Sequence, residues 1–218
     1  MRVGDGRALA VVNPDLACRK AHSPGSIFKL VTAFAALQEK LTREAEVFAC
    51  GGQKKLGEVV LHCTVPNGHG RRTLIEAIAQ SCNVTFYELG TRLGPRRMIS
   101  YARAFGLDRK CPTYSGAQAT GTLPLKPIHP CEVARLAVGQ AAGFRITLLE
   151  AAEMVRRIAT GGIDMQGSAT NLAIIRRAMR LAVTSGTCKN AALPGIEVAG
   201  KTGTPEAEGH TSERSAWF

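Results

Sequence analysis

Long hydrophobic runs are missing from this sequence of 218 residues. No apolar stretch reaches the roughly 18 residues that a membrane-spanning helix requires. The first residues, Met1 to Gly6, also lack the hydrophobic core of a secretory signal peptide. We therefore expect export, and any attachment to a membrane, to depend on a segment outside this sequence.

Acidic and aromatic residues are also scarce. Against 28 Lys and Arg there are 17 Asp and Glu, giving a formal net charge of +11, and aromatic residues make up 5%. The basic residues occur in scattered pairs such as Arg71-Arg72 and Arg176-Arg177, without interleaved aromatics. Nucleic-acid-binding proteins usually concentrate such charge on one face, so we expect no specific nucleic-acid partner. A diffuse positive field suits acidic polymers or anionic lipid headgroups equally well.

The sequence does contain enough apolar residues, 45%, for a folded core. A chain of this length typically forms one domain or two closely joined lobes. Strands are expected at residues 7–13 and 198–204, and residues 50–72 are expected to be an irregular Gly-, Cys- and His-rich segment. Apolar periodicity predicts helices at residues 27–41, 73–80, 84–93, 96–105, 132–138, 148–159 and 171–184.

Three short motifs occur once each: Ser26-Ile27-Phe28-Lys29, Ser81-Cys82-Asn83 and Lys201-Thr202-Gly203-Thr204. Any one of S-x-x-K, S-x-N and K-T-G could arise by chance in a chain this long. All three in this order, and in suitable structural contexts, leave little room for coincidence. The combination is typical of serine acyltransferases that react with penicillins.

The first motif has the chemistry of a nucleophile and its base. A serine hydroxyl is a poor nucleophile at neutral pH and needs a neighbouring base. Pro24 and Gly25 predict that a helix begins near Ser26, and residues three apart share a helix face, so Lys29 should lie beside the Ser26 hydroxyl. Lys29 can accept a proton only if burial or a second cation, for which Lys201 is the candidate, lowers its pKa. The plainer alternative is a capping serine and a solvated lysine.

The other two motifs suit substrate binding. Ser81-Cys82-Asn83 follows a predicted helix, where a capping Ser or Asn is the alternative explanation. The segment from Val198 to Thr204 is predicted as a strand edge with which a substrate backbone could pair. Gly203 removes a side chain where a ligand must come close. The alternative for this motif is a surface turn with a lone lysine.

Together with their flanks, the motifs resemble the transpeptidase domain of class B, monofunctional penicillin-binding proteins. Residues 23–37 are similar to the nucleophile helix of that family, and residues 68–70 and 77–87 are similar to its S-x-N region. The resemblance implies an α+β fold of the β-lactamase/transpeptidase type, with an antiparallel sheet flanked by helices and an all-α lobe. We expect one domain, residues 1–218, with the all-α lobe at roughly residues 40–160 and the sheet lobe at 1–39 and 161–218.

Both ends of the chain depart from the family pattern. The strand expected at residues 7–13 is similar to the second strand of the family's sheet, and its first strand is missing. At Phe218 the family continues into a further strand and a covering helix. We therefore expect an incomplete sheet with an open edge, and with it reduced stability, aggregation or dependence on a partner.

The resemblance also implies residue roles. Backbone N–H groups of Ser26 and Thr204 would form the oxyanion hole. The side-chain roles are Ser26 as nucleophile, Lys29 as base, Ser81 as proton relay, Asn83 as amide anchor, and Lys201, Thr202, Gly203 and Thr204 as the site for a terminal carboxylate.

The implied activity is that of an extracytoplasmic peptidoglycan D,D-transpeptidase. Such an enzyme cross-links D-Ala-D-Ala stem peptides in cell-wall synthesis, is acylated by β-lactams, and works with other cell-wall proteins in processes such as the maintenance of cell shape. No cofactor is implied. Two alternatives stay open: a serine β-lactamase-like hydrolase, for which no deacylation motif is evident, and a catalytically inactive penicillin-binding or scaffold fragment.

Seven cysteines leave at least one unpaired. Some class B relatives carry a pair similar to Cys50 and Cys63, and a disulfide closing that loop would contribute roughly 3 kcal/mol. Cys82 is interpreted as a small packing residue rather than a ligand. Cys50, His62, Cys63 and His69 could also suggest zinc, but their spacing matches no strong metal signature. A disulfide or free thiols are therefore preferred, and no metal site is predicted.

Overall fold

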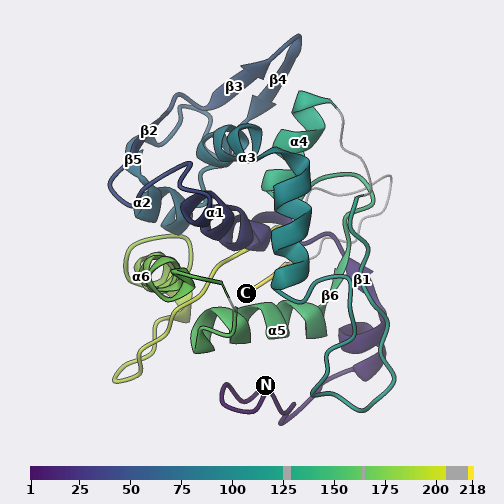
Figure 1. The fold of residues 1–218 in the computed structure, drawn as a ribbon. Coiled ribbons are helices and arrows are strands. Elements are labelled where there is room, and N and C mark those ends of the chain that lie inside the picture. Colours follow the sequence, from purple (N-terminus) through teal and green to yellow (C-terminus); the bar gives the residue numbers. More distant parts are fainter. Residues whose placement is uncertain (125–128, 164, 205–215) are drawn as a thin grey trace.

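Helices make up much of the protein, whose computed structural model describes residues 1–124, 129–163, 165–204 and 216–218 (Figure 1). Within these ranges the helices are α1 (Lys29–Gln38), α2 (Leu74–Ala79), α3 (Asn83–Ala104), α4 (Pro130–Ala137), α5 (Leu148–Thr160) and α6 (Ser168–Thr184), and the short helical turns are η1 (Asp15–Arg19), η2 (Gly25–Phe28) and η3 (Lys189–Ala191). Among the described residues, no helix has the length and apolar character needed to cross a membrane.

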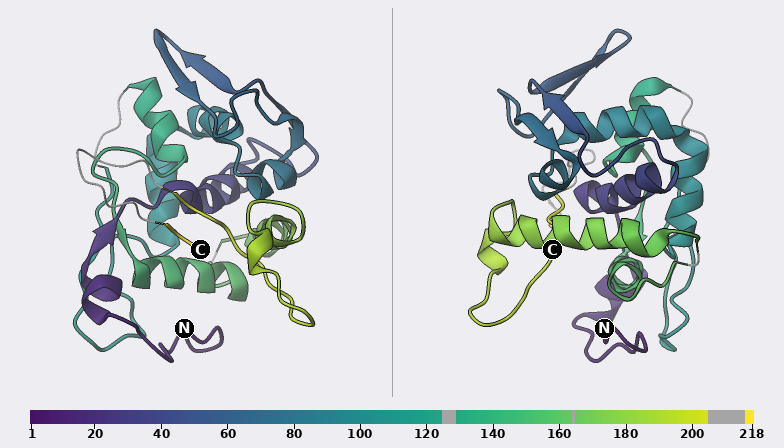
Figure 2. Two further views of the ribbon diagram at one scale, coloured as in Figure 1. Left: turned by 180° about the vertical axis from the view of Figure 1, so that it is seen from behind. Right: turned by 60° about the vertical axis from the view of Figure 1, so that its left-hand side comes forward.

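The strands of the described residues form two-stranded antiparallel sheets. The pairs are β1 (Ala21–His22) with β6 (Ile146–Thr147), β2 (Val47–Cys50) with β5 (Gly70–Thr73), and β3 (Gln53–Leu56) with β4 (Val59–His62). The hairpin of β3 and β4 projects from the body of the molecule in all three views (Figures 1 and 2). The mixture of helices and small antiparallel sheets agrees with the α+β class.

Helix α1 forms the centre of the core. Its residues from Lys29 to Leu37 are all buried, as expected for a helix that is apolar on nearly every side. It packs against α2, α3 and α6, and Figure 2 (right) shows α3 on one side of α1 and α6 on the other. Because α1 is enclosed, the polar groups that it carries are withdrawn from water. Thr32 satisfies its hydroxyl by donating to the Ala137 carbonyl at 2.8 Å.

The helices agree with the predicted ones, apart from shifts at their ends. The helix expected at residues 27–41 is α-helical only from Lys29 to Gln38. Gly25–Phe28 forms a tighter 3₁₀ turn before it, and Lys40 adopts a left-handed φ of 56° after it. The helices expected at 84–93 and 96–105 form α3, which is broken at Gly94, where φ is 72° and ψ is 162°.

Two strand predictions are wrong. Residues 7–13 form no strand, and Val12 is 88% exposed. A strand needs a partner for its backbone hydrogen bonds, and no strand pairs with this segment in the described part of the chain. Residues 198–204 make only an isolated antiparallel bridge, between Gly203 and Trp217.

The segment expected to be irregular, residues 50–72, instead contains β3, β4 and most of β5. Gly57, with a φ of 61°, lies in the two-residue connection between Leu56 and Val59. A positive φ at this position is typical of the tight turns that match the twist of a hairpin. The hairpin therefore depends on one glycine that periodicity does not detect.

Helix α2 begins with a reciprocal cap that fixes its position. The Thr73 hydroxyl accepts from the Glu76 N–H, and the Glu76 carboxylate accepts from the Thr73 N–H at 2.8 Å. Such a cap satisfies two backbone donors and contributes about 1 kcal/mol. This placement matters because the C-terminal end of α2 leads directly into Ser81-Cys82-Asn83.

Candidate active site

Ser26 lies in the η2 turn, directly before α1, and is partly exposed. The segment around Gly139 holds this turn in place. The Gly25 N–H and the Ser23 hydroxyl both donate to the Gly139 carbonyl, at 3.0 and 2.9 Å. Gly139 has a φ of 75°, and a Cβ there would lie 2.2 Å from the Gly25 carbonyl oxygen. Only glycine fits this contact, so a rigid turn presents the serine at the end of a buried helix.

The Lys29 amine, one turn further along, is fully buried and is directed at Ser81 and Asn83. Its Nζ donates to the Ser81 carbonyl at 2.7 Å and to Asn83 Oδ1 at 2.6 Å, and lies 3.2 Å from Ser81 Oγ. The centroid of the Phe86 ring is 5.6 Å from the same nitrogen, a distance at which an aromatic face attracts a cation. The side chains of two predicted motifs therefore meet in one buried site.

Lys201 brings the third motif to the same point. Its Nζ donates to Ser81 Oγ at 2.8 Å and to the Thr202 carbonyl at 2.7 Å, and its residue is 3% exposed. The Ser81 hydroxyl thus lies within hydrogen-bond distance of both amines. Three segments distant in sequence converge on this one oxygen atom.

Burial governs the charges of the two lysines. Withdrawal from water and, second to it, the nearby Lys201 charge hold the pKa of Lys29 well below its usual value. Burial also lowers the pKa of Lys201, to about 8. A buried amine next to a like charge favours its neutral form. These shifts favour the neutral form of Lys29, whereas Lys201, with a pKa of about 8, is mostly protonated at neutral pH.

Ser81 has a backbone conformation that glycine usually adopts. Its φ is 57°, and it occupies the position after the last cap residue of α2. The Ser81 N–H donates to the Ile78 carbonyl and the Cys82 N–H to the Ala77 carbonyl, at 3.1 and 2.9 Å, which is the hydrogen-bond pattern of a Schellman motif. A left-handed residue other than glycine is uncommon and is often found at a functional site. This turn directs the Ser81 hydroxyl and its carbonyl toward the two lysines.

The K-T-G segment lies against the turn that carries Ser26. A Cβ at Gly203 would lie 3.0 Å from the Ile27 side chain and 3.2 Å from the Pro24 carbonyl oxygen. The backbone of Gly203 exchanges two hydrogen bonds with Trp217, at 3.1 and 2.8 Å, and the Trp217 indole N–H donates to the Ser23 carbonyl at 2.9 Å. Glycine at position 203 therefore lets the segment pass close to the serine.

The structure brings most of the predicted residues together, but two of them lie apart from the buried contacts. In the part of the chain that the structure describes, the Ser26 hydroxyl makes no hydrogen bond to Lys29 or to another side chain. Catalytic hydrogen bonds are often long or badly aligned before substrate binds. Thr204 is exposed. Thr187 lies outside the three motifs, yet its hydroxyl lies 2.8 Å from that of Thr202. Its position just after Gly186 is its only distinguishing feature in the sequence.

The comparison with known proteins agrees with the motifs. The family model described as the penicillin binding protein transpeptidase domain matches residues 3–218. Stage V sporulation protein D of Bacillus subtilis is 30% identical over 226 residues, covering 90% of this chain and 35% of that protein. Peptidoglycan D,D-transpeptidase PbpA of Mycobacterium tuberculosis is 32% identical over 240 residues, covering 94% of this chain and 47% of that protein. The chain therefore spans less than half the length of these relatives.

Solved structures show the same fold. The D,D-transpeptidase domain of a peptidoglycan glycosyltransferase from Eggerthella lenta superposes with a TM-score of 0.82 at 26% identity, covering 94% of this chain and 58% of that one. The transpeptidase domain of penicillin-binding protein 3 from Burkholderia pseudomallei superposes with a TM-score of 0.83 at 24% identity, covering 98% and 70%. The predicted β-lactamase/transpeptidase-type fold is thereby confirmed. The chain belongs to the family of penicillin-binding protein transpeptidase domains.

Proposed function

We propose that this chain is a serine D,D-transpeptidase domain of peptidoglycan synthesis, with Ser26 as the nucleophile. The observation that carries the proposal is the convergence of the Lys29 and Lys201 amines on Ser81 Oγ, at 3.2 and 2.8 Å, within a buried site. Relatives named as D,D-transpeptidases support the reaction class. A buried amine with a lowered pKa supports the base that the reaction needs.

The hydrogen bonds around Lys29 suit a neutral amine, which has two N–H donors and one lone pair. Its two shortest contacts, to the Ser81 carbonyl and to Asn83 Oδ1, use the two donors. The lone pair can then accept from the Ser81 hydroxyl at 3.2 Å, while the Lys201 ammonium donates to that hydroxyl oxygen at 2.8 Å. In this arrangement both N–H groups of Lys29 have acceptors, and its lone pair faces the Ser81 hydroxyl, through which a proton could pass.

The proposed reaction follows from this path. Ser26 Oγ attacks the carbonyl carbon of the penultimate D-Ala of a stem peptide, and its proton passes to the Lys29 amine. The C–N bond to the terminal D-Ala then breaks, and the leaving nitrogen takes the proton through the Ser81 hydroxyl. An amine of a neighbouring stem attacks the resulting ester, loses a proton by the reverse route, forms the cross-link and restores Ser26.

Charge and shape at the K-T-G segment suit a substrate that ends in a carboxylate. Lys201 supplies a positive charge behind the segment, and the Thr202 hydroxyl is available at its partly exposed side. Asn83 would hold the substrate amide, and the backbone N–H groups of Ser26 and Thr204 would stabilise the oxyanion. β-Lactams would acylate Ser26 as mimics of the same peptide end.

The hydrolase alternative lacks support from the site. Rapid deacylation of a penicillin ester needs a base that activates water, and in serine β-lactamases of one class this base is a glutamate. Among the described residues, no carboxylate makes a hydrogen bond or ion pair with Ser26, Lys29, Ser81 or Lys201. The buried carboxylates of Glu150 and Glu153 are instead bound to the cap of α5 and to arginines. We therefore favour a transpeptidase, whose acyl-enzyme with penicillin should be long-lived.

Family membership also supports a place outside the cytoplasmic membrane, where peptidoglycan is cross-linked. One solved structure with 28% identity to this chain belongs to a peptidoglycan synthase complex that coordinates polymerization and crosslinking. This likeness supports other cell-wall synthesis proteins as partners. The division into an all-α lobe at residues 40–160 and a sheet lobe stays a prediction.

The test is intact-mass spectrometry after incubation with a penicillin. The expected result is one penicillin adduct, absent from Ser26→Ala and retained in Ser100→Ala, which removes an exposed serine on α3. An adduct that persists for hours supports the transpeptidase, whereas an adduct that is lost within minutes supports a hydrolase. If folded wild-type protein forms no adduct, the reaction is excluded and the inactive scaffold alternative is favoured.

A further inference from the structure

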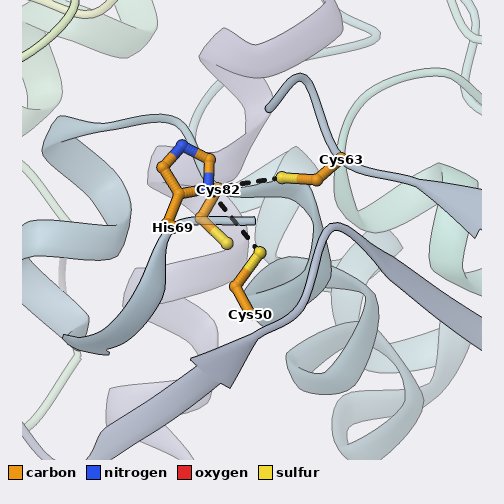
Figure 3. A group of neighbouring side chains, drawn as sticks. All are labelled: Cys50, Cys63, His69 and Cys82. Atoms are coloured by element: carbon orange, nitrogen blue, oxygen red, sulfur yellow. Dashed lines mark hydrogen bonds between the residues drawn. The ribbon is translucent and has the colours of Figure 1, made fainter. Parts of the chain in front are cut away.

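A cluster of three thiols and one imidazole lies directly behind the S-x-N motif. Its members, which we call the thiol cluster, are Cys50, Cys63, His69 and Cys82. Their ligand atoms all lie within 4.8 Å of one another, and Figure 3 shows the three sulfur atoms gathered around the His69 ring. The three cysteines are buried, and all are free thiols. The disulfide considered between Cys50 and Cys63 is therefore not formed in the structure.

The spacing of the donor atoms approaches that of a tetrahedral zinc site. Zinc bonds of about 2.3 Å to sulfur and about 2.0 Å to nitrogen place neighbouring ligand atoms about 3.5–3.8 Å apart at tetrahedral angles. His69 Nδ1 lies 3.6 Å from Cys50 Sγ and 3.4 Å from Cys63 Sγ. These two distances already match the edges of the tetrahedron. A small contraction of the remaining contacts would complete it around a single ion.

Two glycines allow the loops that hold the thiol cluster to lie in close backbone contact. Cys50 ends β2 and Cys63 directly follows β4, while His69 precedes β5. A Cβ at Gly52 would lie 1.9 Å from the Pro66 carbonyl oxygen, and one at Gly68 would lie 2.0 Å from the Cys50 carbonyl oxygen. Only glycine permits these contacts, and both residues have positive φ. The loops that carry Cys50, Cys63 and His69 are thus pressed together through their backbones.

The sulfur atoms also receive hydrogen bonds of the kind that stabilise thiolates. The Asn83 N–H donates to Cys63 Sγ at 3.3 Å, and the Thr85 hydroxyl donates to Cys82 Sγ at 3.4 Å. The Cys63 N–H itself donates to the Gly52 carbonyl at 2.7 Å. Outer contacts of this type orient metal ligands and are part of a functional metal site.

We propose that Cys50, Cys63, His69 and Cys82 bind one zinc ion in a closed tetrahedral site. Soft thiolates with an imidazole favour zinc over the hard ions magnesium and calcium. Because the chain supplies all four ligands, the ion would have a structural role, without an open position for substrate or water. Zinc binding would release the thiol protons and leave the imidazole neutral. This proposal reverses the preference for a disulfide or free thiols. A disulfide would account for only two of the four converging groups.

The site connects the strand loops to the serine and asparagine of the S-x-N motif. Cys82 caps the N-terminus of α3 and lies between Ser81 and Asn83 in sequence. Holding its sulfur to the strand loops would fix the left-handed turn at Ser81 and the start of α3 together. A bound ion would therefore position the groups that contact Lys29, a consequence that rests on the proposed function.

The four ligands of this set do not follow a local sequence pattern. Three of the residues considered for zinc, Cys50, Cys63 and His69, belong to the thiol cluster, whereas His62 does not. Cys82, interpreted as packing, supplies the fourth ligand from a helix start 19 residues beyond Cys63. Its spacing belongs to no common zinc motif, so only the fold reveals it.

The test measures metal content and ligand geometry without reference to catalysis. Protein purified under reducing conditions with zinc should carry about one ion per chain. After removal of zinc, addition of Co²⁺ alone should produce the strong visible bands of a tetrahedral ion and a thiolate charge-transfer band. In the zinc-loaded protein Cys50, Cys63 and Cys82 should resist alkylation, and a chelator should expose them. Half-buried Cys131, which lies outside the cluster, should react in both states.

The variants are His69→Ala and Cys82→Ser, with His129→Ala and Cys131→Ser as a matched pair because those two residues also contact one another. Loss of the ion in the first pair and its retention in the second supports the site. Since the wild-type cobalt spectrum and alkylation pattern need no variant, a failure of the variants to fold leaves the test intact. Absence of tetrahedral cobalt bands, or a Cys50–Cys63 disulfide in zinc-supplied protein, overturns the proposal. Neither result depends on whether Ser26 forms an acyl-enzyme.

Discussion

Replacing Lys29 with Met should change how the stability of the protein depends on pH. Burial and the nearby Lys201 hold the pKa of Lys29 well below its usual value in the folded protein. In the unfolded chain the pKa returns to about 10.4. At a pH between the folded and unfolded pKa values, folding therefore releases one proton from this side chain, and that release opposes folding. Met has a similar length and cannot titrate.

The size of the effect follows from linkage. Between the folded and unfolded pKa values the unfolded state binds one more proton, so the free energy of unfolding rises by about 1.4 kcal/mol per pH unit. The cost of deprotonation therefore grows by about 1.4 kcal/mol for each pH unit below the unfolded pKa, until the folded pKa is reached. Met removes this cost but leaves the Ser81 carbonyl and Asn83 Oδ1 without their Lys29 donor, at about 1–3 kcal/mol each. These two effects oppose one another in the total stability, so the slope of stability with pH is the informative quantity.

Urea denaturation of wild type and Lys29→Met between about pH 7 and about pH 8 measures this slope. Lys201, with a pKa of about 8, also loses protons over this range, but it is present in both proteins, so the difference between their slopes reports Lys29. The wild-type free energy of unfolding should rise more steeply than that of the variant, by about 1.4 kcal/mol per pH unit. Lys110→Met, which removes an exposed lysine, controls for the loss of one charge. Parallel slopes would mean that Lys29 keeps its proton in the fold and cannot be the base.

Three further outcomes are expected. The rate of acylation by a penicillin should fall above about pH 8, because Lys201, with a pKa of about 8, loses the charge that attracts the carboxylate. A rate that stays constant beyond that pH would contradict this role. Ser81→Gly should favour the left-handed φ of 57° but lose the hydroxyl that accepts from the buried Lys201, so its stability should change little. It should acylate about 100-fold more slowly or worse if the hydroxyl relays protons, and stopped-flow rates near those of wild type would refute the relay. Gly139→Ala should lower the free energy of unfolding by about 2–4 kcal/mol, because its Cβ would lie 2.2 Å from the Gly25 carbonyl oxygen. Gly4→Ala, which has open space around it, should unfold like wild type in a denaturant titration.

Motifs and helices were predictable because their signals are local. Apolar periodicity locates α1 to α6 within a few residues, because the buried face of each helix carries apolar residues at a regular spacing along a short stretch of sequence. Short strands gave no such signal. The β3–β4 hairpin depends on Gly57, and the strand expected at residues 7–13 is absent because no partner strand pairs with it in the described structure.

The sequence by itself determined which chemical groups are present and to which family they belong. Tertiary structure alone decided what surrounds them. The pKa of Lys29 depends on its complete burial and on Lys201, 172 residues later in the chain. The thiol cluster depends on loops that approach through Gly52 and Gly68 and on a cysteine at the start of α3. The burial of Lys29 and the approach of the four cluster residues arise only when distant segments pack together. The spacing of neighbouring residues in the sequence therefore cannot predict them.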